Sequence, residues 1–135
     1  MFWTSGIFVF LLLACGIAYY NEDDQLRRTR VYRYAVIPSL IYACIGHLFF
    51  AHRTSVAMGW GDCAGVNTLQ RELGLSQLAM AIVACFFIDD PRPLVMVWSL
   101  GLLMIGVNHV VEKRGVSLLA ASDVMYGSVL LSVFA

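Results

Sequence analysis

The sequence predicts an all-helical integral membrane bundle, and three observations lead to that fold class. Hydrophobic residues make up 60% of the 135 positions and charged residues only 13%, whereas a soluble domain has about 45–50% and about 25%. The apolar residues form uninterrupted runs that are long enough to cross a bilayer. The charged residues stand between these runs. We therefore expect one transmembrane domain with five spans, a four-span bundle being the alternative.

The N-terminal part of the chain contains two of the expected spans. Span 2–20 has no charged residue, and a helix rising about 1.5 Å per residue over this length nearly matches a hydrocarbon core of about 30 Å. The segment 21–33 carries four arginines and is expected to be a loop, because such groups are costly in hydrocarbon. The second span, 34–51, contains Pro38, which predicts a local kink.

The other three spans follow a long polar connection. Segment 52–72 is rich in glycine and polar residues. We expect it either to lie at the membrane interface with Trp60 at headgroup depth, or to fold partly back into the bundle, where the protein can satisfy its backbone. The turn at 89–93 contains two prolines, which stop helices. The remaining spans are 73–88, 94–111 and 116–135.

Charge distribution predicts the partners and the orientation. Nine basic residues balance nine acidic ones, so no net field exists to attract nucleic acid. The lipid bilayer is the expected partner, together with further copies of the chain or the other subunits of a membrane complex. The arginines of 21–33 place that segment in the cytoplasm by the positive-inside rule, which puts the N-terminus outside and the C-terminus in the cytoplasm.

Four ionisable residues are expected to meet near one membrane face. Alternating spans place the ends of the second and fourth spans beside the starts of the third and fifth. His47, Glu72, His109 and Asp123 all belong to this face. Two imidazoles with two carboxylates suit Zn, Fe, Mn or Cu, and ionisable groups within a span usually pair or bind a ligand. The sequence thus predicts a metal, proton or small-molecule site.

Three further residues are candidates for ligand binding or for orienting this cluster: Trp60, Asn108 and Tyr126. A haem held between His47 and His109 is less favoured, because two helical histidines at one depth also arise by chance. The competing hypothesis is structural: the buried polar groups only specify helix pairing in an accessory subunit. Whether the protein is an enzyme stays open. Gly101, Gly106 and Gly127 are expected to allow close helix packing.

Several short motifs resemble a known family. They are Gly46-His47, Gly59-Trp60, Gln70-Arg71-Glu72-Leu73-Gly74, a second histidine ending the fourth span and an aspartate in the last one. Over about residues 40–130 the pattern is similar to a family of small bacterial multi-pass membrane proteins of unknown function, and more distantly to DoxX-like proteins.

The resemblance implies a bacterial inner-membrane protein and brings no activity with it. It also implies shared positions at His47, Trp60, Glu72, Gly74, His109 and Asp123. The chain departs from the family pattern at Gly61, where a proline often follows Gly-Trp, at Leu69, which replaces an aromatic residue, and at Asn108, which replaces a glycine. These departures bear on the conformation of the loop and of any pocket that it forms.

Overall fold

The structure is a computed structural model, and it describes residues 2–58, 60–61, 63–86, 89–113 and 118–135. Every regular element within these ranges is a helix, which confirms the predicted all-α class. Positions 87–88 of the third predicted span, 116–117 of the fifth, and Gly59 lie outside the described residues.

The first two helices show that a polar segment can still be helical. α1 (Phe2–Tyr20) coincides with the first expected span. The prediction of a loop over 21–33 is wrong, because α2 (Asp24–Val31) lies within it. The side chain of Asp23 caps α2 by accepting a hydrogen bond of 2.6 Å from the backbone N–H of Leu26. Polarity keeps a segment out of hydrocarbon, but a capped polar segment forms a helix readily.

A π-helical turn links α2 to the next helix. This turn, η1 (Tyr32–Val36), leads directly into α3 (Ile37–Phe49). Pro38, in the first turn of α3, has no N–H to bond to the preceding turn. The wider winding of η1 lies just before it, and the kink expected at Pro38 stays a prediction.

The expected connection over 52–72 is mostly helical. α4 (Ala51–Met58) folds back after α3, and α5 (Ala64–Phe86) begins well before the predicted start at position 73. The polar residues there lower the hydropathy, which is typical of a loop, but they do not prevent the backbone from forming a helix. Two long helices complete the chain, α6 (Arg92–Lys113) and α7 (Leu118–Phe134).

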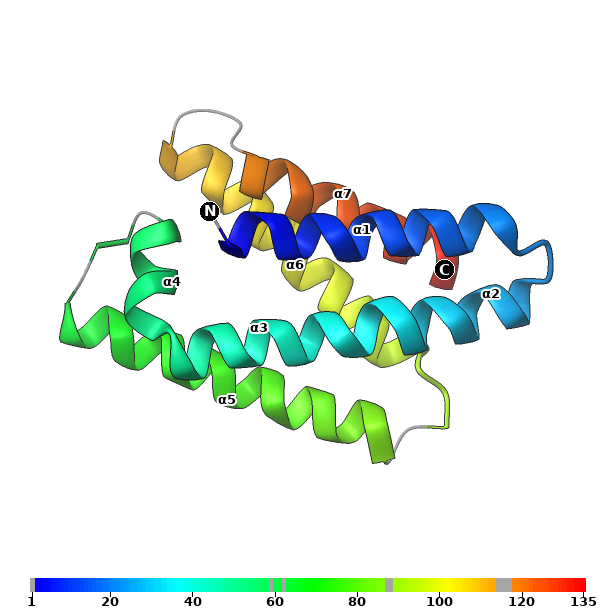
Figure 1. Cartoon of the computed structure of the whole chain (residues 1–135), viewed down its shortest axis with the longest axis horizontal. Coiled ribbons are helices and arrows are strands. Elements are labelled where there is room, and N and C mark those ends of the chain that lie inside the picture. The colour runs from blue at the N-terminus through cyan, green and yellow to red at the C-terminus, as the bar shows by residue number, and fades with distance from the viewer. Residues whose placement is uncertain (1, 59, 62, 87–88, 114–117) are drawn as a thin grey trace.

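The order in which the helices pack side by side differs from their order along the chain. α5 packs on α3, α3 on α1, α1 on α7, and α7 on α6. α6 runs obliquely behind α1 and α3 (Figure 1). In the described part of the chain, α5 and α6 make little direct contact although a short connection joins them. Among the described helices, α5 and α6 therefore leave an open seam between them.

Glycines set the close approach of α6 and α7. A methyl group added at Gly127 would lie 2.8 Å from the Ser99 carbonyl oxygen, and one at Gly106 would lie 3.0 Å from that of Ala120. Gly101 would meet nothing within 4 Å. The packing role predicted for these glycines holds at positions 106 and 127 and is wrong at 101, where an added methyl group would meet open space.

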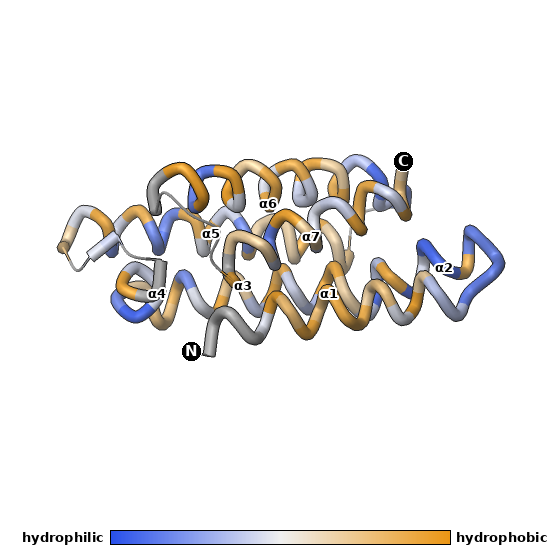
Figure 2. Tube along the Cα trace, turned by 90° about the horizontal axis from the view of Figure 1, so that it is seen from above, coloured by the Kyte–Doolittle hydropathy of each residue, from blue (hydrophilic) through white to orange (hydrophobic). Residues whose placement is uncertain are grey.

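One stretch of the described chain has the length and apolar character of a membrane span, Arg92–Val111, with a mean hydropathy of 2.0. Gly6–Tyr20 and Ala120–Phe134 are apolar but shorter. Polar residues gather at α2 and its connection to α1, whereas α1 and α7 are apolar along most of their length (Figure 2). A single span of this kind is weak evidence for a membrane protein, since a core helix passes the same test.

Candidate functional site

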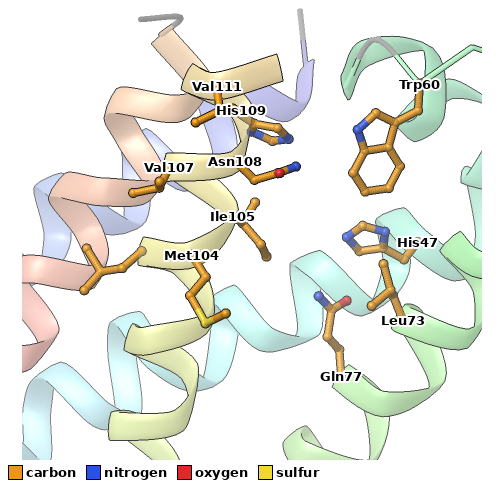
Figure 3. A pocket seen from close by; sticks show the side chains of 11 residues that line it. His47, Trp60, Leu73, Gln77, Met104, Ile105, Val107, Asn108, His109 and Val111 are labelled. Atoms are coloured by element: carbon orange, nitrogen blue, oxygen red, sulfur yellow. The ribbon is translucent and has the colours of Figure 1, made fainter. Parts of the chain in front are cut away.

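The open seam between α5 and α6 contains a cavity of about 740 Å³. α5 contributes Leu73 and Gln77, and α6 contributes residues between Leu103 and Val111, including Met104, Asn108 and His109. His47 of α3 and Trp60, which follows α4, complete the lining (Figure 3). The walls are mainly aliphatic, and the polar groups are few. That combination is typical of small-molecule sites, whose volumes are about 300–1,000 Å³.

His47 joins α3 to α5 at the edge of this cavity. Its side chain is 8% exposed, and its Nδ1 is hydrogen-bonded to Oε1 of the buried Gln70. Because an amide oxygen can only accept, Nδ1 carries the proton in this bond. In the neutral ring Nε2 is then a hydrogen-bond acceptor, so the pairing with Gln70 fixes the tautomer of His47.

His109 lies between Asp123 and the aromatic ring of Trp60. Its Nδ1 is 3.7 Å from Oδ2 of Asp123 on α7, a separation that allows electrostatic attraction but is long for a hydrogen bond. The two residues are 1% and 4% exposed. The ring of Trp60 meets that of His109 edge-on, with centroids 6.5 Å apart. His109 thus connects a buried carboxyl group to the cavity.

The segment after α4 holds Trp60 over the cavity. The Thr54 hydroxyl donates to the Gly46 carbonyl at 3.0 Å, and the backbone N–H of Trp60 donates to the Ser55 carbonyl at 2.9 Å. Gly61 then has a φ of 80°, a left-handed conformation that glycine adopts freely. A proline at this position could not adopt it, because its ring fixes φ near −65°.

The predicted metal ligands are only partly brought together. His109 and Asp123 are neighbours, and His47 lines the same cavity as His109. Glu72 is exposed on α5. No group of three or more His, Cys, Asp or Glu residues that could hold a metal ion occurs in the described ranges. The four-residue metal centre is therefore not confirmed.

The predicted ligand-binding residues divide in the same way. Trp60 and Asn108 line the cavity. Tyr126 is fully buried in the core between helices, where its hydroxyl donates to Oγ of Ser39 at 3.2 Å. Tyr126 therefore ties α7 to α3 and lies away from the cavity lining.

Sequence reasoning missed the two glutamines of α5. The buried residues of this helix are Gln70, Gly74, Gln77, Ala81 and Ala84. They recur at alternating spacings of four and three, the pattern of a helix face that packs on a neighbour. This stripe of small and polar residues in an otherwise apolar segment was the available signal. A glutamine inside such a stripe needs a hydrogen-bond partner or a ligand.

A second, polar pocket lies at the other end of the bundle, lined by residues of α2 and of the connection before α6. There both carboxylate oxygens of Asp90 accept hydrogen bonds from the Arg92 guanidinium, and these bonds hold the pKa of Asp90 below its ordinary value of 3.8. Both groups are exposed. Acidic and basic residues are mixed in this pocket, which gives no preference for one sign of ligand charge.

Comparison of the chain with known protein families, with curated proteins and with solved structures found no match in any of the three. The resemblance to small bacterial multi-pass membrane proteins and to DoxX-like proteins therefore stays a prediction.

Proposed function

We propose that this protein is a five-span membrane protein that binds a small amphipathic molecule in the cleft between α5 and α6. One observation carries the proposal: a cavity of about 740 Å³ with aliphatic walls and a few polar groups, which include His47 and His109 from separate helices. A metal ion alone would leave most of this volume unfilled. No reaction is proposed.

The surface of the helices supports a membrane location. Only 33% of the apolar segment Arg92–Val111 is buried within the protein, although a soluble core helix would be mostly buried. Large side chains such as Leu12 and Val97 are more than half exposed. Lipid would cover this apolar surface, which water disfavours. The bacterial inner membrane, with the N-terminus outside and the C-terminus in the cytoplasm, fits the arginine-rich segment 21–33.

Native cysteines test the spans without mutation. Cys15, Cys63 and Cys85 are exposed on the folded chain, but the five-span topology puts Cys15 and Cys85 in lipid and Cys63 on the outer face. A membrane-impermeant maleimide applied to spheroplasts should modify Cys63 alone, and all four cysteines should react after denaturation in detergent. Modification of Cys15 and Cys85 at the rate of Cys63 in the native protein would contradict the topology.

Photolabelling tests the cleft. para-Octylphenol carrying a diazirine in its alkyl chain should label residues of α5 and α6 that line the cavity, at one saturable site, in protein reconstituted into lipid nanodiscs. Met104→Trp fills the cavity and should abolish this labelling. Val97→Trp, on the same helix outside the cavity lining, is the matched control and should leave it intact. Labelling that never saturates and spreads over α1 and α7 would overturn the proposal.

An accessory-subunit role is the second candidate, and buried polar contacts between helices favour it. The His47–Gln70 and Tyr126–Ser39 bonds link α3 to α5 and to α7, and the proximity of His109 to Asp123 links α6 to α7. Under this hypothesis, His47→Ala and His109→Ala lower thermal stability and leave photolabelling unchanged, and the purified protein contains no stoichiometric metal. It also predicts co-purification with a second copy or with partner subunits.

A further inference from the structure

One polar atom in the cleft has no counterpart within the described chain. Gln77 is 8% exposed, and its side-chain Oε1 is buried without a hydrogen-bond partner among the described residues. Gln77 lines the cavity, and its amide points upward with the nitrogen on the side of α6 and the oxygen on the side of Leu73 (Figure 3). An unsatisfied buried acceptor is costly and rare in native proteins. No described residue supplies the missing donor, so a molecule bound in the cleft can supply it once the amide turns.

The rest of the lining restricts what that donor can be. None of the described residues that line the cavity is Lys, Arg, Asp or Glu. Beside Gln77, a carboxylate or an ammonium group in the ligand would be desolvated against aliphatic walls, where no described lining residue carries a fixed opposite charge, and this costs several kcal/mol. The donor is therefore a neutral group on an apolar molecule.

We propose that Gln77 selects a ligand with a hydroxyl group on an apolar body, such as a phenol or a long-chain alcohol. The hydroxyl donates to Gln77 Oε1 once this oxygen has turned toward the cavity. The terminal amide torsion is soft, so either atom can turn toward the ligand. This inference rests on the proposed function, because it assigns the ligand class of the same cleft.

Trp98 provides a useful contrast. Its indole Nε1 is also buried with no partner among the described residues, but Trp98 packs in the hydrophobic core and is not among the residues that line the cavity. Gln77 therefore differs from Trp98 in having an open volume into which a ligand can bring the missing partner.

The test compares two competitors that differ by one hydrogen-bond donor. Unlabelled para-octylphenol and its methyl ether compete against the diazirine probe in nanodiscs containing wild-type protein. The phenol should compete about tenfold more strongly than the ether, the effect of one hydrogen bond to a buried group. A wild-type protein that binds the two equally overturns the inference and leaves the proposed function standing.

Two variants show whether the preference depends on Gln77. Gln77→Met keeps the unbranched shape and removes the amide, so the phenol and the ether should compete equally. Leu73→Met, on the same helix and in the same cavity, is the control and should retain the preference. A preference that survives in Gln77→Met overturns the inference.

Failure of the site itself gives a different result. If the probe does not label the cleft of wild-type protein saturably, the proposed function and this inference both fall. Folding of each variant is checked by thermal unfolding. Gln77→Met should be at least as stable as wild type, because it removes an unsatisfied acceptor.

Discussion

The two faces of α6 are built in opposite ways. On the face toward α7, Gly106 of α6 and Gly127 of α7 bring the two backbones into contact. Larger residues of this face are buried, and Leu102 is only 3% exposed. Toward α5, large side chains such as Met104 stay 73% exposed around a cavity. One helix thus packs tightly on one partner and stands away from its neighbour in the chain. The difference teaches that the open seam is a local feature of side-chain choice, since α6 packs closely where small residues allow it.

Deleting side chains on the two faces should give the largest contrast in stability. Leu102→Ala leaves a cavity in the tight seam and should lower the free energy of unfolding by about 2–4 kcal/mol. Leu73→Ala, in the cleft, removes a side chain that is 38% exposed and should cost less than about 1 kcal/mol. Thermal unfolding in one detergent measures both. Equal losses would mean that the α5–α6 seam is packed.

Adding a methyl group to glycines of α6 and α7 gives the next largest effect. Gly127→Ala brings a carbon to 2.8 Å from the Ser99 carbonyl oxygen and should destabilise by about 1–3 kcal/mol. Gly101→Ala meets nothing within 4 Å and should stabilise by about 0.5–1 kcal/mol, because alanine is the better helix former. Denaturation in mixed micelles compares the two. A destabilising Gly101→Ala would show that another molecule covers this face.

The buried His109–Asp123 pair should show moderate coupling. A double-mutant cycle with His109→Ala and Asp123→Ala should give a non-additive term of about 1 kcal/mol, as for polar pairs between membrane helices. A cycle with His109→Ala and Ser39→Ala serves as the control. Ser39 bonds Tyr126 instead of His109, so these two losses should add. If the losses in unfolding free energy for His109→Ala and Asp123→Ala are additive, the two side chains do not interact.

Asp90 and Arg92 should give the smallest effect. Since Arg92 lowers the pKa of Asp90, the stabilisation is present above the ordinary value of 3.8 and is lost as pH falls through the lowered value. Both side chains are exposed, so Asp90→Asn should leave the unfolding temperature at neutral pH unchanged within error. Its unfolding profile from neutral pH down to strongly acid pH should follow that of wild type. A marked drop in the unfolding temperature of Asp90→Asn would show that the Asp90–Arg92 pair stabilises the fold more than an exposed ion pair should.

Composition and apolar runs were sufficient to predict the all-α class and the position of α1. Composition and apolar runs failed at α2 and at the start of α5. Hydropathy indicates whether a segment lies in lipid or in water, whereas capping residues and the spacing of buried residues decide whether it is helical. Asp23 and the stripe from Gln70 to Ala84 carried that information. Local helical structure is therefore readable from such positions even where the hydropathy is low.

The sequence predicted the position of the site residues along the axis of the bundle, but it did not predict which helices lie next to one another. Chain alternation places His47, His109 and Asp123 at one end of the bundle, yet it says nothing about which helices are neighbours. The order of packing leaves Glu72 exposed and moves Tyr126 into the core. Gln77 was given no role because the stripe that contains it indicates a buried helix face and does not indicate a ligand. Its significance depends on the cavity, which exists only once α5 and α6 are seen to stand apart.

The central claim is that the seam between α5 and α6 is an occupied binding cleft, and crystallography in a lipidic phase of protein isolated from membranes tests it most directly. We predict elongated density between the two helices, with its polar end within hydrogen-bonding distance of the Gln77 amide and bounded by Trp60. A map in which Leu73 packs directly against Met104, with no space between them, would contradict the claim.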